Sequence, residues 1–468
     1  MRFHSLTYLI FLAVVLAVYW SLPRRAQNAL LVAANYIFYG WEHPWFLLPL
    51  WASTLVDYSC ARGIERFPSC RRSFLIIAVT ASLALLATFK YAGFVVENVN
   101  ALLINLGSDP LRLILHLALP AGLSFYTFQS IGYVVDVYKG RVRAERNLLD
   151  YALYVSFFPQ LVAGPIERAG HMLPQYHSDR RFDPASWRAG IILLLWGFFK
   201  KVVIADNAAV VANKVFALGS PSFPVLWAGV FAFAIQIYAD FSGYTDIARG
   251  CARLLGFELM ENFRHPYLAT SPADFWRRWH ISFSSWLRDF VYIPLGGNRG
   301  GVMRASFNLI ATFALSGLWH GASWNFVLWG LYWGSLILLQ RFLRAVGATP
   351  WIPWFGKVSL TFLATCLGWL LFRERDLAQL GRDLMQSPFD VSFDQWWVGI
   401  YLAAFSFVYA LPLLVHLFVT RALAKGSFVA QSSQNTKLVW DAAVGVLLLT
   451  GILAARSVAT SEFIYFQF

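Results

Sequence analysis

The chain has 468 residues, of which 58% are hydrophobic and only 13% are charged, and its formal net charge is +13. Ordinary soluble domains carry about 25% charged residues, so this composition excludes a string of soluble domains and favours a membrane protein whose helices are apolar on nearly all sides. The basic residues are spread over short loops rather than gathered in one tail, which argues against a nucleic-acid partner and for contact with membrane lipid.

Apolar segments follow one another along the chain. Most of them approach or exceed the length that crosses the hydrocarbon core of a bilayer. We therefore expect an all-α, polytopic integral membrane protein with about 11–12 transmembrane helices, organised as a single domain over residues 1–468. The segments lie near 5–21, 27–41, 44–61, 73–96, 112–138, 188–217, 223–248, 305–320, 322–340, 355–372, 397–419 and 437–456.

The loop charges predict an orientation. Basic loops alternate with loops that carry acidic residues, and the positive-inside rule assigns the basic loops to the cytoplasm. Both termini are then expected outside, and two irregular stretches, 157–187 and 249–304, are expected to be cytoplasmic and partly re-entrant. The basic loops contain Arg24 and Arg25; Arg62, Arg66, Arg71 and Arg72; Lys139, Arg141, Arg143 and Arg146; Arg341 and Arg344; and Arg421 and Lys425.

The stretch YADFSGYTDIARG, residues 238–250, places charge inside an apolar run. Asp240 and Asp246 are six residues apart and do not share a helical face, whereas Asp246 and Arg249 can pair at i, i+3. Paired charge within a bundle is more often structural than catalytic, and the pattern alone favours that interpretation.

The stretch SPADFWRRWHISFSSWLRDF, residues 271–290, begins with a strong helix start, because Ser271 can act as N-cap and Pro272 as the first helical residue. A continuous helix would have an aromatic and a cationic face, which is typical of a helix at the membrane interface. The pattern alone favours a structural role for His280. The aromatic face holds Phe275, Trp279, Phe283, Trp286 and Phe290, and the other holds Arg277, His280, Ser284 and Arg288.

The glycines of YIPLGGNRGG, residues 292–301, can form backbone nests that hold an anion, with Arg299 beside them. The stretch is not a phosphate-binding P-loop, because no G-K-[ST] follows the glycines. A flexible turn explains the glycines equally simply and is the preferred interpretation.

The stretch SGLWHGASW, residues 316–324, places His320 in the middle of a long apolar run. A titratable group at membrane depth is costly and indicates function. Burial should keep the imidazole neutral, which is also the form that accepts a proton from a hydroxyl. Gly317 and Gly321 allow close helix packing, and Asn325 could orient the imidazole or line a polar path. No such context surrounds four other histidines, His43, His116, His265 and His416. The four cysteines show no metal-ligand spacing, so no metal site is expected.

Five stretches, in order along almost the whole chain, together resemble the membrane-bound O-acyltransferase family and are closest to its bacterial alginate O-acetyltransferase branch. They are FFPQLVAGPIER, YADFSGYTDIARG, FWRRWHISFSSWLRDFVYIPLGG, LSGLWHGASWNFVLWG and FIYFQF. The resemblance implies a ring of helices around a central funnel or tunnel, with a catalytic core at about residues 120–345. The family's W-H-G histidine is His320, and its R-R-W-H histidine is His280.

The resemblance also implies an activity in the bacterial inner membrane. A short acyl group, expected to be acetyl, would pass from a cytoplasmic thioester to an extracellular or periplasmic polysaccharide such as alginate. The thioester, for example acetyl-coenzyme A, would act as co-substrate, and no bound cofactor is expected. A periplasmic esterase-like acetyltransferase would be the protein partner. His320 would activate the acceptor hydroxyl and His280 would assist or position the donor. The residues expected to bind the donor or line the tunnel are Trp319, Asn325, Arg277, Arg278, Arg299 and Asp240, the arginines through the donor's negative charge.

Three alternatives remain open from the sequence. D-alanyl transfer to teichoic acid, with a carrier-protein donor, belongs to the same family, although AGPIER and the last six residues favour the acetylation branch. A transporter or lipid flippase would also use polar residues within the membrane, but the chain lacks the internal hydropathy repeat expected of many transporters. A purely structural scaffold accounts for the apolar bulk and leaves His320 unexplained.

Overall fold

The structure is a computed structural model that describes residues 1, 3, 5–111, 118–162, 164–348, 351–424, 434–457, 459 and 461–466. Within these residues all regular structure is helical, as the composition predicted. Residues 112–117, which include His116, and Lys425 lie outside the described residues. The chain divides into two compact units, one formed by Met1–Trp187 with Cys251–Met260 and the other by Arg188–Gly250 with Glu261–Phe468.

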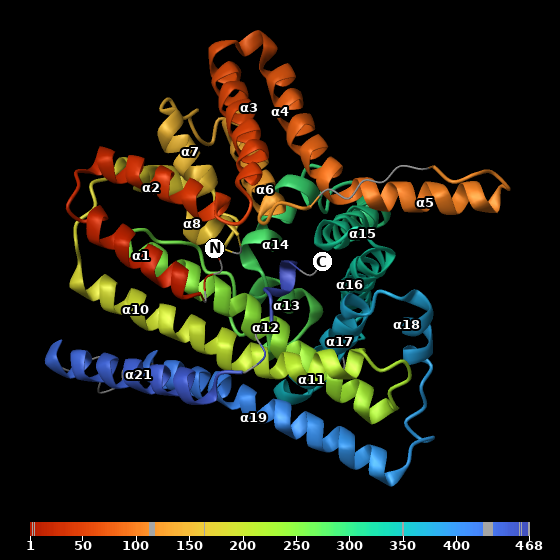
Figure 1. Ribbon diagram of the computed structural model, residues 1–468. Helices are drawn as coiled ribbons and strands as arrows, with labels where there is room; N and C mark the ends of the chain where they lie inside the picture. Colours follow the sequence, from red (N-terminus) through yellow and green to blue (C-terminus); the bar gives the residue numbers. More distant parts are fainter. Residues whose placement is uncertain are drawn as a thin grey trace. The chain divides into compact units, whose positions relative to one another are not determined.

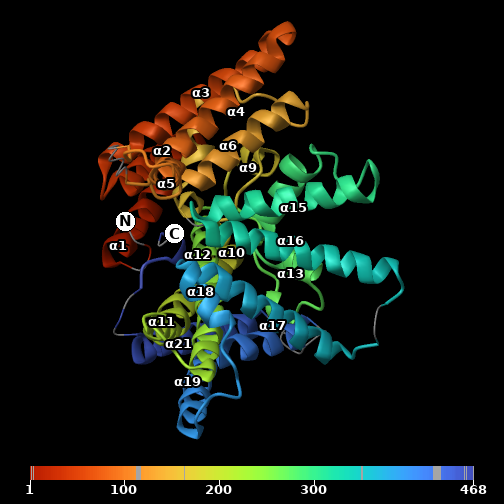
Figure 2. The ribbon, with the colours of Figure 1, turned by 90° about the vertical axis from the view of Figure 1, so that its right-hand side faces the viewer.

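The first unit begins with helices that follow the predicted apolar segments (Figure 1). In two views α3 and α4 run side by side (Figure 2). The stretch 157–187, predicted to be irregular, contains only the short helices α8 and α9 before α10 begins at Pro184. The helices are α1 (Leu6–Tyr19), α2 (Arg24–Gly40), α3 (Leu47–Arg66), α4 (Arg71–Leu86), α5 (Ala92–Asn105), α6 (Leu123–Tyr138), α7 (Leu148–Ser156), α8 (Phe158–Leu161) and α9 (Ala169–His177).

The second unit contains most of the longer helices. Helix α10 enters it from the first unit, and a π-helical turn, η4 (Lys200–Ala205), joins α10 to α11. The elements are α10 (Pro184–Phe199), α11 (Asp206–Phe216), α12 (Phe223–Leu254), η5 (Pro266–Leu268), α13 (Pro272–Arg278), α14 (Ile281–Leu287), η6 (Arg288–Tyr292), α15 (Gly301–His320), α16 (Trp324–Ala345), α17 (Trp354–Arg373), α18 (Leu377–Leu384), α19 (Phe393–Ala424), α21 (Gln434–Ala455) and η7 (Ile464–Phe466).

Among the described residues, seven helical stretches are long and apolar enough to cross a membrane. The other predicted segments also form helices, but these are shorter or more polar; α1, for example, has 14 residues. The chain is thus a multi-pass membrane protein. The seven stretches are Pro68–Asn105, Phe223–Leu254, Gly301–His320, Trp324–Ala345, Trp354–Arg373, Phe393–Arg421 and Asn435–Ala455.

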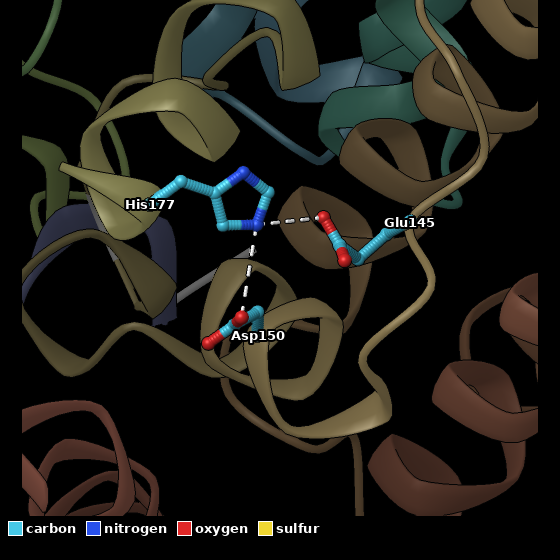
Figure 3. Close-up of side chains that lie close together, drawn as sticks. All are labelled: Glu145, Asp150 and His177. Atoms are coloured by element: carbon cyan, nitrogen blue, oxygen red, sulfur yellow. Dashed lines mark ion pairs between the residues drawn. The ribbon is translucent and has the colours of Figure 1, made fainter. Parts of the chain in front are cut away.

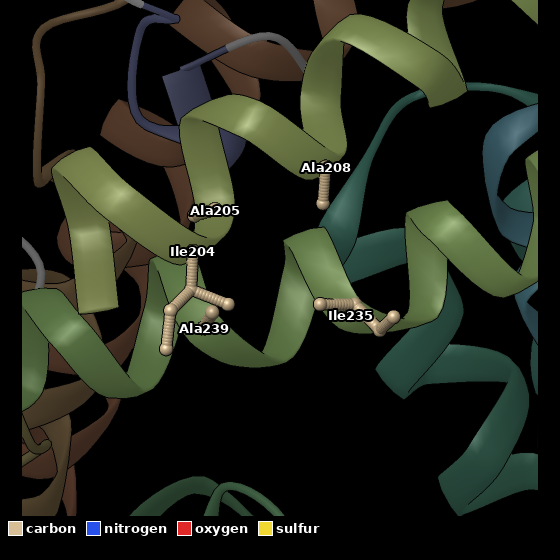
Figure 4. Close-up of a cluster of buried hydrophobic side chains, with 5 residues drawn as sticks. All are labelled: Ile204, Ala205, Ala208, Ile235 and Ala239. Atoms are coloured by element: carbon tan, nitrogen blue, oxygen red, sulfur yellow. The ribbon is translucent and has the colours of Figure 1, made fainter. Parts of the chain in front are cut away.

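Small side chains allow the run from η4 into α11 to pack closely on α12 (Figure 4). Without a hydrophobic driving force between helices in lipid, close van der Waals contact is a main source of their association, and small residues permit it. This packing fixes the position of η4, which carries two lysines into the interior of the unit. The buried cluster consists of Ile204, Ala205, Ala208, Ile235 and Ala239.

Helices α15 and α16 form a tight hairpin in which glycines meet the opposing backbone (Figure 2). A Cβ atom on Gly317 would collide with the carbonyl oxygen of Phe326, and one on Gly330 would collide with the carbonyl oxygen of Phe313. The structure therefore confirms the close helix packing that the G-x-x-x-G spacing predicted. His320 is the last residue of α15 and lies at the turn of this hairpin.

Replacing Gly317 with alanine should destabilise the α15–α16 hairpin. The added methyl group meets a backbone carbonyl, which cannot move aside as a flexible side chain can, and overpacking of this kind costs about 1–3 kcal/mol. The thermal unfolding midpoint of the detergent-purified protein should fall by several degrees. Gly381→Ala in α18 is the matched control, because nothing lies within 4 Å of a Cβ there. An equal midpoint for wild type and Gly317→Ala would contradict the packing described.

Candidate active site

His320 is the last residue of α15 and lies at the turn between two apolar helices. Gly321 leaves the helix with an extended backbone (φ −163°), and α16 begins three residues later at Trp324. The histidine is only 4% exposed. A proton accepted by this imidazole would lie at the end of α15, where the terminal carbonyl groups carry partial negative charge.

The imidazole of His320 is surrounded by an aromatic cage, defined here as Phe283, Trp319, Trp329, Phe372 and Tyr465. The cage draws on five elements, α14, α15, α16, α17 and η7. Such surroundings exclude water and strengthen any electrostatic interaction made inside. Ring centroids lie 4.9 Å from His320 for Trp319, 5.0 Å for Trp329, 5.4 Å for Phe372, 5.5 Å for Phe283 and 5.6 Å for Tyr465.

The second candidate, His280, contacts the same cage. Its ring centroid lies 4.9 Å from that of Phe283, 6.0 Å from that of Trp319 and 6.4 Å from that of Tyr465. The structure thus brings together two histidines that are 40 residues apart in the sequence. Three rings of the cage, those of Phe283, Trp319 and Tyr465, contact both histidines.

The prediction of one continuous helix over 271–290 was wrong. Its start is as predicted, since the Ser271 hydroxyl accepts a hydrogen bond from the amide of Asp274 (3.2 Å). However, α13 ends at Arg278, Trp279 is extended, and His280 adopts a left-handed conformation (φ 45°) before α14 begins. The predicted aromatic and cationic faces therefore do not exist as two sides of one helix, and His280 is fully buried instead of lying on a polar surface.

Asn262 supplies the reason for this break. Its backbone carbonyl accepts from the amide of Ile281 (3.0 Å), and its Oδ1 accepts from the amide and hydroxyl of Ser282 (3.2 and 3.0 Å). These bonds replace those that a continuous helix would make. A residue in the left-handed region is strained, and such strain persists where surrounding contacts enforce it.

The same asparagine fixes the chemical form of His280. Because Asn262 Oδ1 accepts from a backbone amide, the atom facing His280 Nδ1 at 3.1 Å is an acceptor, and Nδ1 must donate. Burial lowers the pKa of His280 to about 3, so the imidazole is neutral at physiological pH. A neutral imidazole with its proton on Nδ1 carries its lone pair on Nε2.

The three predicted donor-binding arginines lie outside the aromatic cage. Arg277 and Arg278 both pair with Asp274, at 3.2 and 3.0 Å. Arg277 is nonetheless the more accessible of the two, with 69% of its side chain exposed. Arg299 is exposed in a turn where Gly296, Gly297, Gly300 and Gly301 all have positive φ, which explains why glycine is needed there.

Asn325 and Asp240 make hydrogen bonds to the segments that carry two of the cage rings. Asn325 Nδ2 donates to the carbonyl groups of Leu371 and Phe372 (3.3 and 3.2 Å), which ties the start of α16 to the end of α17. Asp240 pairs with Lys201 (3.0 Å), and its Oδ2 accepts from the amide of Ile464 (2.8 Å). Both residues are buried. Their contacts hold Phe372 and Tyr465 in the cage.

Elsewhere in α12, the structure confirms the predicted ion pair of Asp246 with Arg249, at 3.4 Å.

Sequence reasoning missed the ion network around Lys201, whose side chain is fully buried. Lys201 pairs with Asp206 (2.8 Å) as well as with Asp240, and it donates to the carbonyl of Ser461 (2.8 Å). The Ser461 hydroxyl in turn donates to Asp206 (2.5 Å). The network thus anchors the segment that carries Tyr465. Its signal was a lysine pair in the predicted apolar segment 188–217, since a cation at membrane depth indicates a buried partner or a function.

The arrangement is suited to proton transfer in a dry, apolar space. A neutral imidazole can take a proton from a hydroxyl group, and the apolar rings around it keep water away from that transfer. The exposed Arg277 on α13 and the exposed Arg299 in the glycine turn suit an anionic molecule that approaches from water.

Comparisons with known proteins point to one family. The model of the membrane-bound O-acyltransferase family, MBOAT, matches residues 141–364. The chain is 36% identical to the probable alginate O-acetylase AlgI of Pseudomonas putida over 98% of each chain. It is 33% identical to the peptidoglycan O-acetyltransferase of Helicobacter pylori, over 98% of this chain and 95% of that protein. It is 26% identical to the teichoic acid D-alanyltransferase of Bacillus subtilis, over 54% of this chain and 68% of that protein.

Proposed function

Because the chain belongs to the membrane-bound O-acyltransferase family, we propose that it O-acetylates a polysaccharide outside the cytoplasm, alginate being the first acceptor to test. The observation that carries the proposal is the 36% identity to an alginate O-acetylase over 98% of both chains. The acyl donor is a cytoplasmic thioester, acetyl-coenzyme A in the simplest case, which acts as co-substrate.

In the proposed reaction His320 is the general base. It takes the proton of the acceptor hydroxyl while the oxygen attacks the carbonyl carbon of the thioester. A carbon–oxygen bond forms, the carbon–sulfur bond breaks, and the proton passes from the imidazolium to the departing thiolate. The buried imidazole in its aromatic cage supports this role. His280, kept neutral by burial and oriented by Asn262, positions the acyl group beside the rings that contact both histidines.

The proposed donor path runs past exposed cations. Arg277, Arg278 and Arg299 attract the phosphates of the donor, Trp319 and the rest of the cage line the acyl end of the path, and Asp240 and Asn325 support that lining. The catalytic core then comprises residues at about 120–345 together with the segment that carries Tyr465.

Reversing the charge of Arg277 should raise the apparent KM for acetyl-coenzyme A and leave kcat unchanged, because the side chain is exposed and lies outside the aromatic cage. Steady-state kinetics with varied donor concentration measure both constants. Arg344→Glu, at another exposed arginine near the end of α16, is the control and should leave both constants unchanged. An unaltered KM in Arg277→Glu would remove this arginine from the donor site.

The proposed location is the bacterial inner membrane, with basic loops in the cytoplasm and both termini in the periplasm. Because the glycan lies beyond the membrane, the hydroxyl activated by His320 is the first to receive the acetyl group, and a periplasmic esterase-like acetyltransferase then passes that group to a hydroxyl of the glycan. The alternation of loop charge supports this orientation.

A second acceptor is favoured by one comparison. The 33% identity to a peptidoglycan O-acetyltransferase extends over 98% of this chain, whereas the match to the D-alanyltransferase covers 54% of it. Peptidoglycan is therefore the second acceptor to test, and D-alanyl transfer from a carrier protein is the third reaction.

Proteoliposomes that enclose radiolabelled acetyl-coenzyme A test the proposal. Alginate or peptidoglycan is supplied outside, each with its periplasmic acetyltransferase partner, and label on the outer acceptor is measured. Label on alginate supports the proposal, and label on peptidoglycan alone replaces the acceptor. Acetyl transfer would be overturned if these liposomes transferred no label while liposomes that enclose a D-alanyl carrier protein as donor did.

A further inference from the structure

A second group of titratable side chains lies in the first unit and takes no part in the proposed reaction. Glu145 precedes α7, Asp150 lies in its first turn, and His177 is the last residue of α9. The three side chains point toward one another (Figure 3). Their convergence from two helices and a loop requires an explanation, because nothing in the sequence spacing predicted it.

The distances between the three side chains suit a bound metal ion. His177 Nε2 lies 3.0 Å from Glu145 Oε2 and 3.6 Å from Asp150 Oδ2, and the three ligand atoms all lie within 4.8 Å of one another. Three nitrogen or oxygen ligands placed tetrahedrally around zinc at about 2.1 Å are separated by roughly 3.4 Å. Small side-chain movements would therefore admit an ion between them.

Both carboxylates are buried and held in place by supporting hydrogen bonds. Glu145 and Asp150 are 8% and 7% exposed. Glu145 Oε1 accepts from the amides of Arg146 and Asn147 (2.7 and 2.9 Å), which leaves Oε2 turned to His177. Asn28 donates to Asp150 Oδ1 (2.7 Å). Oriented ligands with satisfied outer contacts are a common property of metal sites.

Within the described part of the chain, the two carboxylates of the cluster carry more negative charge than their one ion-pair partner can balance. Among the described residues, the structure records ion pairs of these two carboxylates with His177 alone. Arg180 interacts with Asp150 electrostatically at longer range, and its Nη2 donates to Asn28 Oδ1 (2.6 Å), the residue that in turn donates to Asp150. Two buried carboxylates with one weakly basic partner leave negative charge that a divalent ion would neutralise.

A cavity of about 450 Å³ borders the cluster and gives access to it. Glu145 and His177 line this cavity, together with Ala169, Leu173, Arg141 and Arg143. Arg141 is paired with Asp136 (3.1 Å), which reduces its repulsion of an entering cation. The cavity also leaves room for a water molecule as fourth ligand, as three-ligand zinc sites require.

We propose that Glu145, Asp150 and His177 bind one divalent transition-metal ion, with zinc as the best fit, and that this ion fastens the end of α9 to α7. The imidazole ligand selects zinc and its neighbours over Mg²⁺ and Ca²⁺, which prefer oxygen ligands alone. The ion takes the place of the proton that His177 Nε2 shares with Glu145. The competing explanation is a simple ion pair of protonated His177 with the two carboxylates.

Zinc binding to the full-length protein distinguishes the two explanations. The protein is purified in detergent with a tag that contains no histidine, stripped with a chelator, and dialysed against Zn²⁺. Mass spectrometry of the metal content should find about one zinc per chain in wild type and loss of that zinc in His177→Ala and Asp150→Asn. Competition with a fluorescent chelator should show at least a tenfold weaker affinity in both variants.

His171→Ala is the matched control, because His171 lies on the same helix, is similarly exposed, and pairs with Glu167. It should keep the zinc of wild type. Zinc should raise the unfolding midpoint of wild type and of this control but not of His177→Ala, since a ligand of the folded state stabilises it. Asp150→Asn keeps the side-chain shape and covers the case in which His177→Ala does not fold. Wild type without bound zinc, or equal zinc in wild type and His177→Ala, would overturn the proposal.

Discussion

His320→Ala should lose acyl transfer almost completely while the protein remains folded in the membrane. General-base catalysis contributes about 10²–10⁴-fold to a rate, and His320 contacts all five rings of the aromatic cage. The initial rate of label transfer in the proteoliposome assay measures the effect. The amount of reconstituted protein and its thermal unfolding midpoint show whether the fold is preserved.

Two further variants separate base catalysis from packing. His320→Gln keeps much of the volume and the hydrogen-bonding capacity of the side chain but cannot act as a base, so its activity should be as low as that of the alanine variant. His416→Ala removes another partly buried histidine from a membrane-spanning helix, where the ring stacks on Trp196 (4.4 Å between centroids), and should retain transfer. Substantial activity in His320→Gln would contradict the base assignment.

Lys201→Met should strongly destabilise the second unit. The change removes the cation between Asp206 and Asp240, which are both 1% exposed, and leaves two buried carboxylates facing each other. Breaking a buried ion pair by removing one partner costs about 3–5 kcal/mol. The thermal unfolding midpoint in detergent should fall sharply, and acyl transfer should fall with it, because the segment that carries Tyr465 loses its anchor.

Restoring charge balance should recover stability. Asp206→Asn and Asp240→Asn added to Lys201→Met remove the uncompensated charges, and neutral replacements of buried ionic groups are often tolerated. Lys214→Met, at an exposed position in α11, controls for the loss of a lysine as such. An unfolding midpoint for Lys201→Met equal to that of Lys214→Met would show that the network does not stabilise the fold.

Local features of the fold were predictable because they depend on neighbours in the sequence. Apolar runs predicted the helices, the Ser271–Pro272 pair predicted the start of α13, and the i, i+3 spacing predicted the pair of Asp246 with Arg249. The G-x-x-x-G spacing likewise predicted the tight α15–α16 hairpin. In each case the determining contacts lie within one helix or between two consecutive helices.

The composition of the candidate site was only partly predictable, because its remaining contacts join distant parts of the chain. His320 was recognisable as a titratable residue in an apolar run. The break at His280 depends on Asn262, which lies 18 residues earlier. The anchor of Tyr465 depends on Lys201, whose contact with Ser461 spans 260 residues. No local pattern encodes such pairings, so a helical periodicity that was correct at Ser271 failed nine residues later.

The hydrogen bond from Ile464 to Asp240 also imposes an order on the protein's synthesis. These residues are separated by 224 positions, which a ribosome covers in roughly 11–45 s at about 5–20 residues per second. During that interval α12 has been translated, while Ile464, whose amide will donate a hydrogen bond to Asp240, has not. The candidate active site therefore stays incomplete until the segment that carries Ile464 and Tyr465 has been translated.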